Sequence, residues 1–136
     1  MSDSEKWAWW TLGVVALTTA AYGAFLAFLG HGPATPSVFA LLALTSLPAF
    51  SRRHFQGPNF DEREREIASK AQVAGFSAFW LAFVGVLVAI GFARGWSGTL
   101  TLPVWTLSEI ICWAWILVIS VQSVTTIVLY RGGAHA

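Results

Sequence analysis

Charged residues are scarce in this sequence. Asp, Glu, Lys and Arg make up 11% of the 136 residues, against about 25% in ordinary globular proteins. A soluble protein of this size covers its surface with polar side chains, and this chain has too few of them. Apolar residues make up 56% of the sequence, which also excludes an intrinsically disordered chain. The composition therefore predicts a membrane protein.

Other absences exclude several kinds of chemistry. Cys112 is the sole cysteine, so thiol–disulfide exchange has no second thiol, and we expect Cys112 to pack as a small apolar residue. His31, His54 and His135 lie outside the long apolar runs, so no ligand pair for haem or a metal falls within the membrane. The net charge of +1 argues against a nucleic-acid partner. No phosphate-binding glycine loop or metalloprotease motif occurs, and we predict a non-enzymatic protein without cofactor or metal.

The long uncharged runs predict four transmembrane helices, at residues 7–29, 37–51, 72–93 and 103–130. The first run has 23 residues, or about 34 Å of helix, which exceeds the ~30 Å hydrocarbon core of a bilayer. No basic segment or cleavage site marks it as a signal peptide, so we interpret it as a true span. The second run is short, and Pro48 will kink or end it. The predicted fold class is a single all-α domain, a four-helix membrane bundle.

The basic residues predict the orientation of this bundle. Seven of the eight fall on one side of the predicted membrane: Lys6, Arg52, Arg53, Arg63, Arg65, Lys70 and Arg131. Basic loops remain in the cytoplasm, so both termini and residues 52–71 are predicted to be cytoplasmic in a plasma-membrane protein. Several Trp residues lie near the ends of the spans, where amphipathic rings favour the headgroup region of the bilayer.

The third predicted helix extends beyond the membrane. Nine of the fifteen charged residues lie between Arg52 and Lys70. Asn59 is a suitable helix cap, and Asp61–Arg65 and Glu66–Lys70 are ion pairs four residues apart in the favourable order. No helix breaker separates them from residue 72, so one continuous helix is predicted to enter the membrane from the cytoplasm. A series of small residues would allow close helix packing: Ala71, Gly75, Ala78, Ala82 and Gly85, with a matching series Gly13, Ala16, Ala20 and Ala24 in the first span.

The same segment carries a resemblance to a known group of proteins. The pattern D-E-R-x-x-x-I-x-x-K-A consists of Asp61, Glu62, Arg63, Ile67, Lys70 and Ala71. Followed by a transmembrane helix, this pattern resembles a signature of small prokaryotic four-helix membrane proteins that are grouped as domains of unknown function. Some members are encoded beside small helix-turn-helix regulators. The resemblance implies signalling through the cytoplasmic face and implies no reaction.

Glu109 is the single charged residue inside a predicted span, and an ionisable residue there is a functional candidate. Trp105 and Trp113 lie four residues to either side. A carboxylate among tryptophans resembles the binding site of small multidrug-resistance transporters, where it exchanges protons for a cationic drug. In that family the glutamate lies in the first helix, and here the first helix has no acid. The sequence favours a solvated Glu109 at the outer interface, or a pair with Arg94, over a buried protonatable site.

Three functions follow from these patterns. The first is a regulatory or accessory membrane subunit that binds a protein partner or a second copy of itself. The predicted binding surface consists of the charged residues Arg52, Arg53, Asp61, Glu62, Arg63, Arg65 and Lys70. The second is a proton-coupled transporter of small cations with Glu109, Trp105 and Trp113 at its site. The third is a structural subunit of a larger membrane complex, which differs from the first only in the permanence of the partner.

Overall fold

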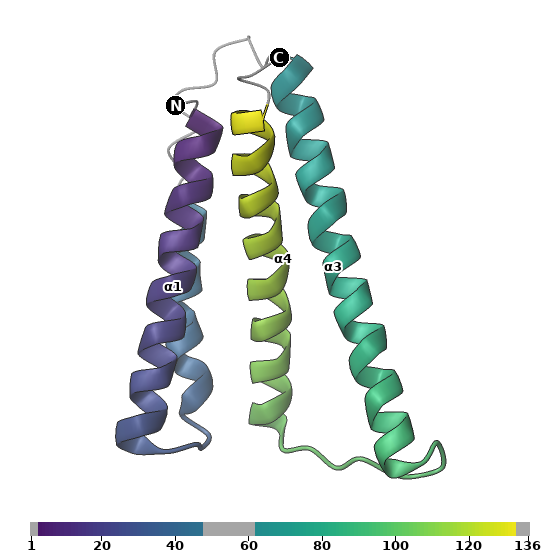
Figure 1. Cartoon of the computed structure of the whole chain (residues 1–136). Coiled ribbons are helices and arrows are strands. Elements are labelled where there is room, and N and C mark those ends of the chain that lie inside the picture. Colours follow the sequence, from purple (N-terminus) through teal and green to yellow (C-terminus); the bar gives the residue numbers. More distant parts are fainter. Residues whose placement is uncertain (1–2, 48–61, 133–136) are drawn as a thin grey trace.

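The computed structural model describes residues 3–47 and 62–132, and these residues form four helices and no strand. In chain order the helices are α1 (Asp3–Leu29), η1 (Thr35–Ser46), α3 (Glu62–Arg94) and α4 (Val104–Gly132), as Figure 1 shows. Helices α1, α3 and α4 are long and apolar enough to cross a membrane, whereas η1 is a shorter apolar helix. The predicted all-α class is confirmed, with three helices of spanning length in the described residues.

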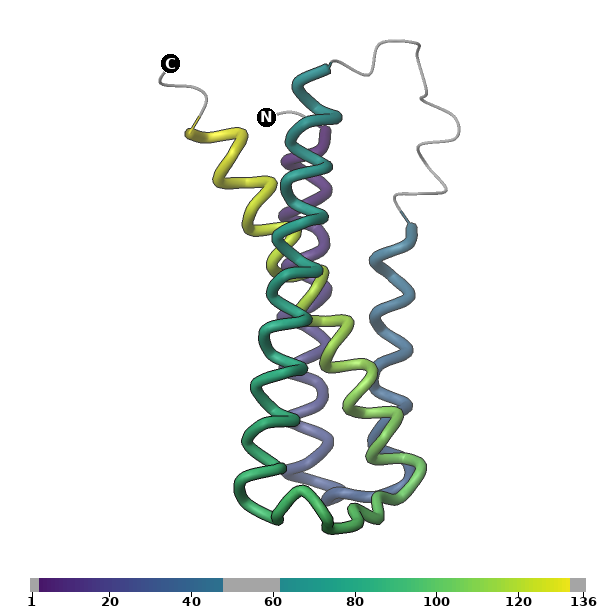
Figure 2. The backbone as a smooth tube through the Cα atoms, turned by 90° about the vertical axis from the view of Figure 1, so that its right-hand side faces the viewer, coloured from purple at the N-terminus to yellow at the C-terminus, as the bar shows by residue number. Residues whose placement is uncertain are grey.

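Helix α4 lies at the centre and packs against each of the other three helices (Figures 1 and 2). On one side it meets η1, where Phe39 and Leu42 pack against Ile116 and Ile119 of α4 in the buried core. Rings from three helices surround this core. Trp113 lies edge-on to Tyr22 and to Phe39, with ring centroids 5.2 and 5.5 Å apart. Such edge-to-face contacts stabilise the packing beyond their buried area.

Helix η1 is a 3-10 helix, where the sequence predicts an α-helix over residues 37–51. Its exposed side chains recur at every third residue and are all small: Ser37, Ala40, Ala43 and Ser46. The hydroxyls favour this winding, because those of Ser37, Thr45 and Ser46 each donate to the carbonyl three residues earlier at 2.6 Å. With a rise of about 2.0 Å per residue, the twelve residues of η1 span about 24 Å instead of about 18 Å. Residues 48–51 lie outside the described residues.

Helix α3 is a single helix of 33 residues, which confirms the predicted continuity from the charged segment into the apolar run. It packs against α4 through its first half. Ala71 and Gly75 are buried there, and a Cβ atom added to Gly75 would lie 2.5 Å from Cγ of Gln122. Residues 81–90 are all exposed, and α3 and α4 diverge in this region (Figure 1).

The small residues of α1 do not form the predicted packing surface. Gly13, Ala16, Ala20 and Ala24 are all exposed. Helix α1 instead buries its other side, through Ala8, Val14 and Thr18, against η1 and α4. The series predicted on α3 is correct for Ala71 and Gly75 and wrong for Ala82 and Gly85, which are exposed. Small residues permit a close approach, but the larger side chains Val14 and Phe39 decide which sides of the helices are covered.

Candidate functional site

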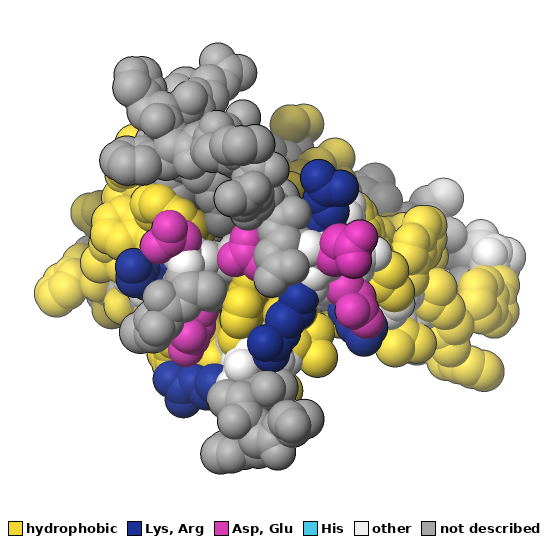
Figure 3. Space-filling model, turned by 90° about the horizontal axis from the view of Figure 1, so that it is seen from above, with side chains coloured by type: hydrophobic (Ala, Val, Ile, Leu, Met, Phe, Trp, Pro, Cys, Tyr) yellow, Lys and Arg dark blue, Asp and Glu magenta, His cyan; other side chains and the backbone are white. Residues whose placement is uncertain are grey.

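Charged side chains gather at one end of the molecule, where α1 and α3 begin and α4 ends (Figures 1 and 3). We call this the charged end. Of the described charged residues, all but Arg94 and Glu109 belong to it: Asp3, Glu5, Lys6, Glu62, Arg63, Glu64, Arg65, Glu66, Lys70 and Arg131. Apolar side chains lie on both sides of these charges in the view along the helices (Figure 3).

Two ion pairs at the charged end are exposed. Lys6 lies 3.0 Å from Asp3 on α1, and Lys70 lies 2.6 Å from Glu66 on α3. The hydrogen bond from Lys70, together with its positive charge, lowers the pKa of Glu66 below its ordinary value. Exposed pairs of this kind contribute little to folding, because water screens them. The charged groups of these two pairs are therefore exposed on the surface, and they do not hold the helices together.

Two partly buried contacts join the helices at the charged end. Arg131 Nε donates to Glu5 Oε1 at 3.4 Å, and its guanidinium lies 5.6 Å from the centroid of the Trp9 ring. The Tyr130 hydroxyl donates to Glu64 Oε1 at 3.2 Å. These contacts tie the last turn of α4 to α1 and to α3. Sequence reasoning missed both pairs, although the predicted orientation placed all four partners on the same side of the membrane.

The residues predicted to bind a partner are only partly described. Arg52, Arg53 and Asp61 lie outside the described residues. The other four, Glu62, Arg63, Arg65 and Lys70, are exposed along the first turns of α3.

The apolar positions of the D-E-R-x-x-x-I-x-x-K-A pattern have a different role. Ile67 is 7% exposed and Ala71 is 3% exposed, so both residues are buried in the bundle. Part of this pattern therefore serves helix packing, while its described charged members face outward.

A shallow groove of about 970 Å³ continues from these charged turns along α3. All of its lining residues belong to this one helix: Ser69, Gln72, Val73, Phe76, Ser77, Trp80, Leu81, Val84 and Gly85. Most of them are apolar and exposed. The side chains of Ser69, Gln72 and Ser77 have no hydrogen bond within the described part of the chain. The groove therefore combines an apolar surface with free hydrogen-bonding groups.

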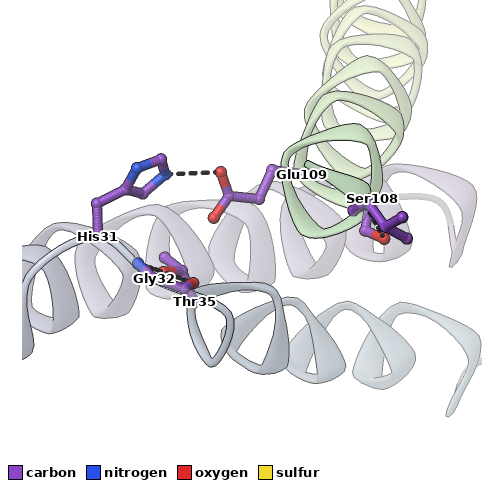
Figure 4. A network of polar contacts seen from close by, with 6 residues as sticks. His31, Gly32, Thr35, Ser108 and Glu109 are labelled. Carbon is purple, nitrogen blue, oxygen red and sulfur yellow. Dashed lines mark hydrogen bonds and ion pairs between the residues drawn. The ribbon is translucent and has the colours of Figure 1, made fainter. Parts of the chain in front are cut away.

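Glu109 lies at the opposite end of the molecule, in the second turn of α4. Its Oε2 atom is 2.8 Å from Nε2 of His31, which lies in the turn between α1 and η1 (Figure 4). The Glu109 side chain is 7% exposed and that of His31 is 49% exposed. Gly30 positions the histidine, because its φ of +76° ends α1 and reverses the chain direction. The Trp105 ring stands edge-on to the imidazole, with centroids 4.5 Å apart.

The second carboxylate oxygen of Glu109, Oε1, is buried and has no hydrogen-bond partner in the described residues. Burying an unpaired polar atom is costly, so such an atom calls for an explanation. The sequence favoured a solvated Glu109 or a pair with Arg94. The structure instead buries the carboxylate and pairs it with His31, since the turn at Gly30 brings the imidazole to the start of α4.

The structure separates the other residues of the predicted transport site. Trp105 lies beside His31 and so belongs to the Glu109 surroundings, whereas Trp113 packs with Tyr22 and Phe39 in the core. Cys112 packs against the same core, as the sequence predicts. Within residues 3–47 and 62–132, no group of three or more His, Cys, Asp or Glu side chains is placed to hold a metal ion.

No protein-family model, curated protein or solved structure matches this chain. The resemblance carried by the segment 61–71 therefore stays a prediction.

Proposed function

We propose that this chain is a small non-enzymatic membrane protein, an accessory or regulatory subunit that binds a protein partner along α3. The observation that carries the proposal is the open side of this helix. Exposed charges on its first turns continue directly into the groove that begins at Ser69, and no other described helix covers that groove. All of the described charged side chains except Arg94 and Glu109 lie at the same end of the molecule.

The composition of the groove favours a transmembrane helix of the partner as its occupant. Helices in lipid associate through van der Waals packing and interhelical hydrogen bonds. Gln72 and Ser77 supply groups that lipid chains cannot hydrogen-bond and a polar side chain of a partner helix can. The exposed Arg63 and Arg65, one to two turns before the groove, would face the charged residues that follow the partner's span. One continuous contact would then run from the cytoplasm into the bilayer.

The proposal places α1, α3 and α4 across the plasma membrane with the charged end in the cytoplasm. It places η1 in the membrane as part of the second predicted span, residues 37–51, because α1 and α3 both begin at the charged end and the chain returns between them. The lengths and apolar composition of the three helices support the crossing. The distribution of basic residues supports the orientation, because Arg94 is the single basic residue assigned to the other side.

Purification of the full chain in mild detergent tests the partner contact. We expect wild type to retain a partner protein and an Arg63→Glu/Arg65→Glu variant to lose most of it, because both side chains are exposed and neither holds the fold. An Asp3→Asn/Lys6→Gln variant is the matched control, since it removes an exposed ion pair at the same end but on α1. If no partner is retained by wild type, or if both variants retain the same partner as wild type, α3 is not the contact.

A second candidate function is proton-coupled transport of small cations. The specific observation in its favour is the buried Glu109 carboxylate, which has one oxygen without a partner and the other 2.8 Å from His31. Uptake that depends on pH and is abolished by Glu109→Gln would support transport. Ser108→Ala is the control, because this exposed neighbour bonds only to the carbonyl of Val104. Unchanged uptake in the Glu109→Gln variant would reject this candidate.

A further inference from the structure

A cavity of about 270 Å³ lies at the charged end, between the first turns of α1 and α3 and the last turns of α4. It is separate from the groove on α3 and from Glu109. Its lining is unusually polar for a chain of this composition: Ser4, Trp7, Ala8, Thr11, Glu64, Ile67, Ala68, Gln122, Ser123, Thr126 and Tyr130. The volume lies just below the ~300–1,000 Å³ of typical small-molecule sites, so only a small group fits.

Most hydroxyl groups of the lining already donate their protons. Thr11 donates to the carbonyl of Trp7 at 3.0 Å, Thr126 to the carbonyl of Gln122 at 2.8 Å, and Tyr130 to Glu64 at 3.2 Å. A hydroxyl has one proton and two acceptor lone pairs. These three hydroxyls therefore have only acceptor capacity left, and the carboxylate of Glu64 adds more. A ligand that donates hydrogen bonds fits these four acceptors, while the indole of Trp7, the amide of Gln122 and the hydroxyl of Ser123 remain as donors in the same lining.

The charge of the lining is negative. Glu64 is the one charged side chain among the lining residues, and it lies in the first turn of α3, where the helix dipole stabilises a carboxylate. The nearby Arg131 does not line the cavity, since its guanidinium is directed to Glu5 and Trp9. The last turn of α4 brings the negative end of its helix dipole to the cavity and the first turns of α1 and α3 bring positive ends, so the negative charge of the lining is that of Glu64. Trp7 and Tyr130 add aromatic rings, which attract cations.

We propose that this cavity binds a primary ammonium group, with Glu64 as the counter-ion. An ammonium has three N–H donors and no acceptor, which matches a lining with a carboxylate and three hydroxyls that can only accept. A carboxylate or phosphate ligand would be repelled by Glu64. A neutral alcohol of the same size has one donor and no charge, so it would gain much less from this lining.

Two sources supply a primary ammonium group: a free short-chain amine, or a lysine side chain of a protein bound at the charged end. Titration of the full detergent-solubilised chain, followed by saturation-transfer NMR of the ligand, tests both. Propylammonium represents the free amine, and Nα-acetyl-lysine amide represents the lysine side chain. 1-Propanol and propionate have nearly the same shape as propylammonium and differ in charge. We expect at least one of the two amines to bind about tenfold more tightly than 1-propanol, and propionate not to bind.

Two glutamate variants make the test specific. Glu64→Gln should weaken amine binding about tenfold, since it removes the counter-ion. Glu66→Gln is the matched control, because this carboxylate is exposed two residues later and faces Lys70; it should change binding by less than about twofold. Thr126→Val leaves the shape of the side chain and the charge of the lining unchanged and removes one hydroxyl acceptor, so it should weaken amine binding about threefold. This variant replaces Glu64→Gln in the test if Glu64→Gln does not fold.

The outcomes separate the two sources and the proposal from its alternatives. Tighter binding of the acetyl-lysine amide identifies a protein lysine as the source, and tighter binding of propylammonium identifies a free amine. Equal binding of the amines and 1-propanol overturns the proposal. Equal losses in the Glu64 and Glu66 variants also overturn it, because they reveal general attraction to a charged surface. None of these results depends on whether a protein partner copurifies along α3.

Discussion

At the scale of single residues, the contact between His31 and Glu109 shows how burial changes the role of a charged group. The two residues are 78 positions apart and are joined by one short hydrogen bond. His31 is half exposed while Glu109 is buried, and the imidazole supplies the one side-chain partner that the buried carboxylate has in the described residues. Without His31, both oxygens of Glu109 would lack a partner within the described structure.

We therefore predict that His31→Ala lowers the free energy of unfolding by about 1–3 kcal/mol, because it leaves a buried carboxylate unsatisfied. The same substitution in a Glu109→Leu background should cost less than about 0.5 kcal/mol, as expected for a half-exposed side chain without a partner. Denaturation in detergent micelles, followed by circular dichroism, gives both values. Equal costs in the two backgrounds would mean that His31 acts independently of Glu109.

The ion pair between Glu66 and Lys70 leads to a prediction about pH. Lys70→Met should raise the pKa of Glu66 toward its ordinary value, because it removes both the hydrogen bond and the positive charge that lower it. NMR titration of the Glu66 carboxyl carbon measures this shift, and Lys6→Met on α1 should leave it unchanged. Since the pKa of Glu66 is lowered in the folded chain, the pair favours folding above the ordinary pKa. That contribution is lost as the pH falls through the lowered pKa. A Glu66 pKa that does not move in Lys70→Met would exclude the pair.

The sequence predicted the environment of some single residues correctly, but it did not predict which residues contact each other across helices. Cys112 was correctly expected to pack as a small apolar side chain. Trp105 and Trp113 were grouped with Glu109 by their spacing, yet Trp113 belongs to the core. Spacing along one helix specifies which residues share a face, but it does not specify which other helix covers that face. The pair His31–Glu109 depends on the turn at Gly30, and it joins that turn to α4, 78 positions further along the chain.

At the scale of elements, the sequence predicts long helices well and the short one poorly. Helix α3 was expected to be continuous because no Gly or Pro interrupts its charged first turns, and the structure confirms this. Helix η1 differs from the expected α-helix because Ser37, Thr45 and Ser46 bond three residues back. Hydrophobic periodicity is a weak signal in such a segment, since nearly all of its residues are apolar.

The contact between α3 and α4 depends on Gly75. Gly75→Ala should lower the free energy of unfolding by about 1–3 kcal/mol, because the added Cβ would lie 2.5 Å from Cγ of Gln122 and 2.9 Å from the carbonyl oxygen of Val118. Gly85→Ala on the same helix is the control. No atom lies within 4 Å of its added Cβ, so it should stabilise the helix by about 0.5–1 kcal/mol. Equal effects of the two variants in detergent denaturation would show that the close approach at Gly75 is unimportant.

At the scale of the whole molecule, the distribution of charge carries most of the information. The scarcity of charged residues predicted four apolar spans, of which the described structure has three as helices of spanning length. The clustering of the charges predicted that α1 and α3 begin, and α4 ends, at the same end, as the structure has them. The arrangement of the helices around α4 was not predictable, because the exposed and the buried sides of these helices are both apolar. For the same reason, neither the groove on α3 nor the cavity beside Glu64 was anticipated.

The orientation across the membrane gives the last prediction. In a Cys112→Ser background, single cysteines at Asp3, Glu62 and Thr101 occupy exposed positions at the two ends. A membrane-impermeant maleimide should label Thr101→Cys in intact cells, and the other two only after permeabilisation, because the orientation proposed from the basic residues places the charged end in the cytoplasm. The sharpest comparison is between Asp3 and Glu62. Helix η1 spans about 24 Å and stops short of the charged end (Figure 2), yet α1 and α3 both begin there. Labelling of Asp3→Cys and Glu62→Cys from opposite sides would therefore contradict the structure itself, whereas labelling of both in intact cells would only reverse the orientation.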